Sequence, residues 1–127
     1  MPSPSERPLG VLTLLADPAP LQPLLLQLRS HGIQVDTATD LGHARALFFG
    51  AGGHDCLVIA HDVRPGLAAR VLRSLRSVDP TLPTATFGPR VAGERAPSRT
   101  ARLASFHPGS RAAAGALLRF LQSLSRD

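Results

Sequence analysis

Short apolar runs alternate with stretches of helical spacing along most of this chain. Five runs have the length and composition of β-strands: 11–15, 33–38, 56–60, 84–87 and 103–106. The run at 56–60 is the most apolar, which is typical of a central strand with both faces covered. The run at 33–38 alternates between apolar and polar residues, which suits a strand near the edge of a sheet.

Apolar residues between and after these runs recur every three or four positions, the spacing of one face of a helix. The four helical faces predicted in this way are Leu21, Leu24, Leu25 and Leu28; Leu41, Ala44, Leu47 and Phe48; Val71, Leu72, Leu75 and Val78; and Ala113, Leu117, Phe120, Leu121 and Leu124. Thr39 and Asp40 are suited to cap the second helix, and Pro65-Gly66 is predicted to break the loop before the third. Residues 88–102 hold two Gly, two Pro and four Arg, so we expect a loop there, or a helix that is short or disordered.

This alternation of strands and helices predicts an α/β fold. Parallel strands joined by right-handed crossovers follow from the alternation, and the simplest closure is a doubly wound sheet of five strands. We place a single domain at residues 9–127 and expect residues 1–8, with their three prolines, to be a disordered leader. Functional groups of doubly wound sheets collect at the carboxyl ends of the strands, so we expect a functional site at that edge.

Composition narrows the class of protein. Hydrophobic residues make up 43% and charged residues 18% of the chain, which is typical of a globular protein. The start of the chain lacks the basic and apolar stretches of a signal peptide, and the apolar runs are too short to cross a membrane, so we expect a cytoplasmic protein. The single cysteine, Cys56, excludes an internal disulfide and is predicted to be a buried, unreactive thiol.

Charge is distributed unevenly along the chain. All 14 basic residues are Arg. Residues 1–63 hold three Arg against six acidic residues, a net charge of −3, whereas residues 64–127 hold eleven Arg against three acidic residues, a net charge of +8. This asymmetry indicates an acidic partner or a polyanion. The alternative is that the arginines only solvate helix faces.

Three short segments follow one another along the chain: Asp17-Pro18 after the first predicted strand, residues 55–59 at the third, and His107-Pro108 after the fifth. In this order they resemble the receiver domain of bacterial two-component response regulators, namely the end of its acidic motif, its third strand and its Lys-Pro dipeptide. The resemblance covers about residues 9–125, without a gap between Val11 and Arg76. It implies a flavodoxin-like doubly wound parallel sheet of five strands in the order 2-1-3-4-5.

The residues that give receivers their chemistry are replaced in this sequence. The resemblance places Leu15 and Ala16 at the acidic pair and Ala60 at the phosphoacceptor position. It places Gly88 at the Thr/Ser switch position, Ala104 at the aromatic switch position and His107 at the lysine position. Mg²⁺ requires hard oxygen ligands, and without them the charge of a transferring phosphoryl group is not neutralised. We therefore expect no phosphorylation. A shifted register offers Asp62 as a displaced acceptor.

Histidines and carboxylates at the expected carboxyl edge raise the alternative of a metal site. Two His and two carboxylates are suited to Zn²⁺ or another transition metal; the weak candidates are Asp17, His61, Asp62 and His107. No tight ligand motif supports this site, so we expect no metal and interpret these residues as loop polar residues that fill a vacated active site. The remaining histidines, His31, His43 and His54, are predicted to be surface residues.

The function that follows is a pseudo-receiver, a phosphorylation-independent protein–protein interaction module in bacterial signal transduction or regulation. The resemblance implies partner or dimer contacts through the fourth helix, fifth strand and fifth helix. The arginines expected there are Arg90, Arg95, Arg99, Arg102, Arg111 and Arg119, and they suit an acidic protein.

Two other functions stay open. The first is a nucleic-acid-binding accessory protein that uses the Arg-rich second half, although the sequence has no helix-turn-helix signature and no aromatic stacking platform. The second is a metal-binding protein on a flavodoxin-like scaffold. No Gly-x-Ser-x-Gly elbow and no phosphate-binding Gly-rich loop is present, so we expect neither an enzyme nor a cofactor.

Overall fold

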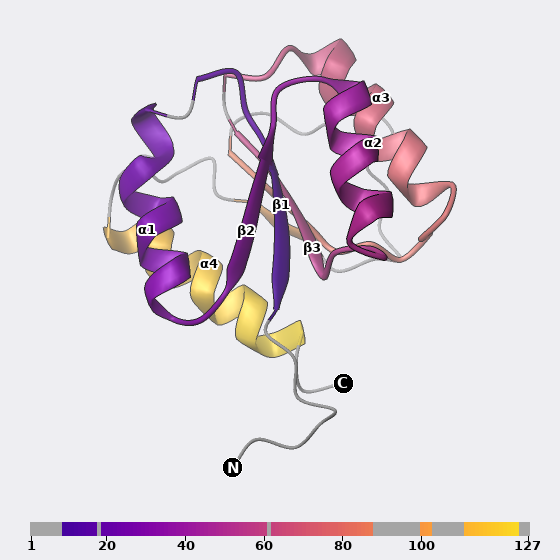
Figure 1. Ribbon diagram of the computed structural model, residues 1–127. Helices are drawn as coiled ribbons and strands as arrows, with labels where there is room; N and C mark the ends of the chain where they lie inside the picture. The colour runs from indigo at the N-terminus through magenta and orange to yellow at the C-terminus, as the bar shows by residue number, and fades with distance from the viewer. Residues whose placement is uncertain (1–8, 18, 61, 88–99, 103–110, 125–127) are drawn as a thin grey trace.

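The computed structural model describes residues 9–17, 19–60, 62–87, 100–102 and 111–124, which form helices on both faces of a parallel sheet (Figure 1). The sheet has five strands in the order β2-β1-β3-β4-β5. The elements in chain order are β1 (Gly10–Leu14), the 3₁₀ helix η1 (Ala19–Leu21), α1 (Gln22–Ser30), β2 (Gln34–Ala38), α2 (Leu41–Gly50), β3 (Cys56–Ile59), α3 (Pro65–Arg76), β4 (Thr84–Thr86), β5 (Thr100–Arg102) and α4 (Arg111–Leu124).

Alternate residues of the strands divide the core into two layers. Val11 and Leu15 pack with α1 and α4, whereas Leu12 and Leu14 pack with α2 and α3. Every residue of β3 is buried, as expected for a central strand of a parallel sheet. The fold class predicted from the alternating pattern, α/β with a parallel doubly wound sheet, is confirmed.

Local signals set the ends of the helices. The side chain of Asp40 accepts a hydrogen bond from the backbone N–H of His43 at 2.7 Å and caps α2, as predicted. Gly32, with φ of +79°, supplies the left-handed residue after α1. The prediction for Pro65-Gly66 was wrong, because Pro65 is the first residue of α3, a position where the missing N–H costs no hydrogen bond. Val78 lies beyond the end of α3 and is exposed.

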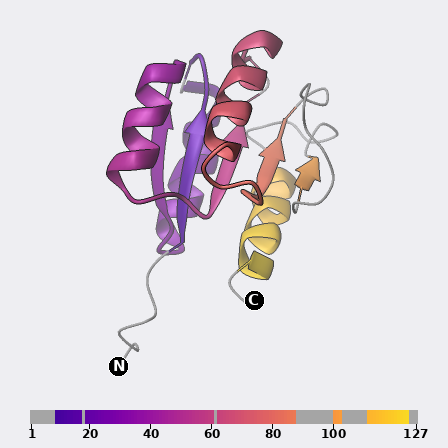
Figure 2. The ribbon, with the colours of Figure 1, turned by 90° about the vertical axis from the view of Figure 1, so that its right-hand side faces the viewer.

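The fifth strand differs from the prediction. It was expected at 103–106, but β5 consists of Thr100–Arg102, paired with β4 through Thr84↔Thr100 and Thr86↔Arg102. The backbone ladder defines this strand, whereas the prediction followed hydrophobicity, which Thr-Ala-Arg lacks. Figure 2 shows β4 and β5 side by side, with α4 against this end of the sheet. The expected leader at 1–8, most of the segment 88–102 and the run at 103–106 lie outside the described residues.

Within the described ranges, no helix is long and apolar enough to span a membrane.

Candidate functional site at the carboxyl edge of the sheet

Apolar side chains occupy the ends of the two central strands. The register pairs Leu14 with Ile59, and the N–H of Ala60 donates to the carbonyl of Leu14 at 2.9 Å. Leu15 and Ala60 therefore lie next to each other just beyond β1 and β3, and each is only 2% exposed. These are positions at which the resemblance to receivers would require a Mg²⁺ ligand and the phosphoacceptor. Ala16, at the second position of the acidic pair, is exposed.

Asp62 joins the loop after β3 to the loop after β1. Its Oδ1 accepts the backbone N–H of Ala16 at 3.1 Å, and its Oδ2 accepts that of Asp17 at 2.9 Å. Asp17 in turn accepts the N–H of Ala19 at 3.0 Å, a local turn that leads into η1. Hydrogen bonds to a carboxylate are stronger than neutral ones. Both oxygens of Asp62 are thus committed to holding the first loop in place.

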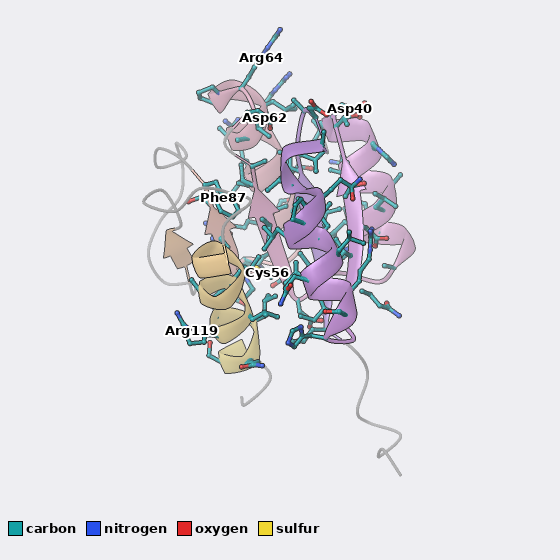
Figure 3. All side chains as sticks on the ribbon, turned by 90° about the vertical axis from the view of Figure 1, so that its left-hand side faces the viewer. Asp40, Cys56, Asp62, Arg64, Phe87 and Arg119 are labelled. Carbon is teal, nitrogen blue, oxygen red and sulfur yellow. The ribbon has the colours of Figure 1, made fainter. Side chains whose placement is uncertain are left out.

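An open hollow of about 280 Å³ adjoins this connection. Residues from the loops after β1, β2 and β3 and from the first turns of α3 line it: Leu15, Ala16, Thr39, Asp62, Val63, Arg64, Leu67 and Arg70. Arg64 and Arg70 are exposed, and Figure 3 shows Arg64 pointing into solvent at the same end of the molecule as Asp62 and Asp40. No side chain caps the N-terminus of α3. Two arginines and an uncapped helix N-terminus against the single carboxylate of Asp62 leave the lining with a net positive charge.

The structure brings together only part of the predicted metal set. Asp17 and Asp62 meet through the Asp17 backbone N–H, while His61 and His107 lie outside the described residues. Among the residues that are described, no three His, Cys, Asp or Glu side chains form a group that could hold a metal ion. The predicted switch positions Gly88 and Ala104 also lie outside the described ranges.

The predicted arginine face is described only in part. Arg119 lies on α4 and is exposed (Figure 3). Arg102 belongs to β5 and Arg111 begins α4. The other members of the predicted set, Arg90, Arg95 and Arg99, lie outside the described residues. The expected contact surface therefore stays a prediction.

The opposite, amino edge of the sheet holds a polar pair, a buried His54 and a partly exposed Asp36, that the sequence did not predict. His54 was expected at the surface but is 9% exposed, stacks on Phe48 at 5.7 Å between ring centroids, and places its Nε2 at 2.8 Å from Oδ2 of Asp36. The neighbouring Asp55 accepts the N–H of Gly10 at 2.7 Å. The sequence around His54 and Asp55 does not predict these contacts, because the partner residues lie on other elements: Gly10 on β1, Asp36 on β2 and Phe48 on α2.

Cys56 is fully buried in β3, as predicted. Burial raises the pKa of its thiol far above the ordinary range, since an apolar environment disfavours the thiolate. The thiol is therefore no candidate nucleophile.

Comparison with known proteins locates the fold. No family model matches the sequence, and no curated protein matches it. Among solved structures, chemotaxis protein CheY4 of Vibrio cholerae is similar with a TM-score of 0.69 and 17% identity, over 93% of this chain and 99% of that one. A two-component response regulator from Clostridium difficile gives 0.68 and 15%, over 93% and 96%. A response regulator receiver protein from Sinorhizobium medicae gives 0.66 and 16%, over 92% and 97%. This chain therefore has the fold of response regulator receiver domains.

Proposed function

We propose that this chain is a receiver-fold interaction module that binds a protein partner without being phosphorylated. The observation that carries the proposal is the apolar end of the central strands, where Leu15 and Ala60 are each 2% exposed. A receiver needs carboxylates at these positions to bind Mg²⁺ and to accept the phosphoryl group. The similar structures named above are response regulators, which favours a role in bacterial signal transduction in the cytoplasm.

Asp62 is a poor substitute for the missing acceptor. Each of its oxygens accepts a backbone N–H, at 3.1 Å from Ala16 and at 2.9 Å from Asp17. Transfer of a phosphoryl group to either oxygen would remove at least one of these bonds. A hydrogen bond to a charged group contributes roughly 1.5–3 kcal/mol, and less at exposed positions such as these, where water replaces part of what is lost. The side chains of Leu15 and Ala16 also supply no oxygen ligand for Mg²⁺, so no metal ion would neutralise the charge of the phosphoryl group.

Phosphorylation is tested by incubating the protein with acetyl phosphate and Mg²⁺ and measuring its intact mass. An ordinary receiver with the acidic pair and the acceptor serves as the positive control, and Asp62→Asn is the matched variant. We expect no added phosphate on this chain while the control receiver is modified. A stable phosphate adduct on this chain would overturn the proposal. Its loss in Asp62→Asn would then identify Asp62 as the acceptor.

A further inference from the structure

The outer surface of α2 and α3 carries a row of exposed arginines beside an exposed aromatic ring. We call this surface the α2–α3 arginine face and define it by Arg45, Phe49, Arg64, Arg70 and Arg73, all of which are exposed. The two helices lie side by side on the same face of the sheet (Figure 1). The face lies on the side of the sheet opposite α4, so it is distinct from the arginine surface expected from the sequence.

Arg45 is held in place before any partner arrives. Its Nη1 donates a hydrogen bond to Oγ of Ser74 at 2.7 Å, which links α2 to α3. Its Cζ lies 5.3 Å from the centroid of the Phe49 ring, a cation–π contact. Phe49 is 44% exposed and meets the buried Phe48 edge-to-face. A side chain ordered in this way loses less conformational entropy on binding than a free arginine does.

The other arginines continue the row along α3. Arg70 precedes Ser74 by one helical turn, roughly 6 Å. Arg73 lies three residues after Arg70, so the two side chains are neighbours on the helix surface. Arg64, immediately before the helix, lies about 15 Å from Ser74 along the axis at about 1.5 Å per residue. Arg64 and Arg70 also line the hollow at the carboxyl edge. The positive charge therefore extends from the hollow down the helix pair to Phe49.

No ion pair between described residues neutralises this row. The sequences of α2 and α3 contain neither Asp nor Glu. Within the part of the chain that the structure describes, none of the four arginines forms an ion pair. Asp40 accepts the backbone N–H of His43 at the cap of α2. Asp62, in the loop after β3, accepts the backbone N–H groups of Ala16 and Asp17.

We propose that the α2–α3 arginine face docks an acidic segment of a protein partner, with carboxylates on the arginines and an apolar side chain on Phe49. The proposal rests on the interaction role proposed above. Guanidinium groups bind carboxylates in a bidentate manner, and arginine and aromatic side chains dominate interface energetics. The row extends about 15 Å along α3, from Arg64 to Ser74, so a helical partner segment of roughly ten residues would cover it. Arg45 covers one face of the Phe49 ring, which makes the ring a poor stacking surface for a nucleic-acid base.

Two probes and two double variants test the proposal. The probes are a labelled helical peptide with Glu on one face and one Leu, and its Gln-for-Glu counterpart. Binding is measured by fluorescence anisotropy at low and at physiological salt. Arg70→Ala/Arg73→Ala removes two charges from the face. Arg29→Ala/Arg119→Ala removes two exposed charges elsewhere, one of them (Arg119) on the α4 surface expected from the sequence, so this variant compares the two surfaces. Circular dichroism checks that each variant is folded.

We expect the Glu peptide to bind more tightly than the Gln peptide and to lose about tenfold in affinity with Arg70→Ala/Arg73→Ala. The control double variant should stay within about twofold of the unmodified protein. Equal losses in both variants, or no binding of the Glu peptide at low salt, would overturn the proposal. Tighter binding of random single-stranded DNA that depends on Arg70 and Arg73 would also overturn it, in favour of a nucleic-acid surface. Modification by acetyl phosphate would refute only the phosphorylation-independent role, because the peptide assay contains no phosphodonor.

Discussion

Replacing Asp62 with alanine tests how the carboxyl edge is held together. The variant loses two hydrogen bonds between a carboxylate and backbone N–H groups, those of Ala16 and Asp17. Bonds to charged groups contribute roughly 1.5–3 kcal/mol each when buried. Ala16 and Asp17 are exposed, so water replaces part of what is lost. We therefore expect Asp62→Ala to lower the free energy of unfolding by about 1–2 kcal/mol, which corresponds to a fall in Tm of roughly 4–8 °C for a domain of this size.

The assay is urea unfolding followed by far-ultraviolet circular dichroism, because the chain has no Trp or Tyr for fluorescence. Asp17→Ala is the matched control, since it removes a carboxylate at the same edge but only one local hydrogen bond. Hydrogen exchange reports on the loop itself, and the amides of Ala16 and Asp17 should lose protection in Asp62→Ala. Equal stability of the two variants, with unchanged exchange at these amides, would refute the assignment of Asp62 as the connection between the loops.

Three further predictions concern the cap, the core and the thiol. Asp40→Ala should lower the free energy of unfolding by about 1 kcal/mol through loss of the α2 cap, and Asp40→Ser should restore most of it in the same urea titration. Leu57→Ala, at a fully buried position of β3, should cost roughly 2–5 kcal/mol, whereas an equal cost for Gln22→Ala on the exposed side of α1 would contradict the described packing. Cys56 should resist a thiol reagent in the native protein and react after unfolding. Burial raises the pKa of the Cys56 thiol above the unfolded value of 9.0, so the thiol should leave the free energy of unfolding unchanged below that pH and lower it above that pH. Unfolding titrations from pH 7 to pH 10 would detect this.

The sequence predicted those parts of the fold in which local pattern and tertiary role agree. Residues 56–60 are continuously apolar because β3 is covered on both faces, and Asp40 is a strong cap wherever a helix follows it. The pattern failed at β5, where backbone pairing with β4 defines a strand that has little apolar character. The pattern also failed at Pro65, because proline is typical of loops but is equally suited to the first turn of a helix.

The candidate site was predicted less completely than the fold. The absence of carboxylates at Leu15 and Ala60 is visible in the sequence once the register is known. The roles of Asp62 and His54 are not, because each depends on a partner far away in the chain: Ala16 and Asp17 for one, and Asp36 for the other. The α2–α3 arginine face requires the two helices to be placed side by side, which spacing within either helix alone does not reveal.

Under the function proposed above, the buried apolar residues at the ends of β1 and β3 determine how readily phosphotransfer chemistry could be introduced into this chain. Ala60→Asp alone would put a carboxylate in a site that is 2% exposed, and Leu15→Asp alone would do the same beside it. A buried charge without a compensating ion is costly, so each single step lowers stability before any activity is gained. Under that function, installing a receiver site in this chain is therefore a problem of several coupled substitutions rather than of one.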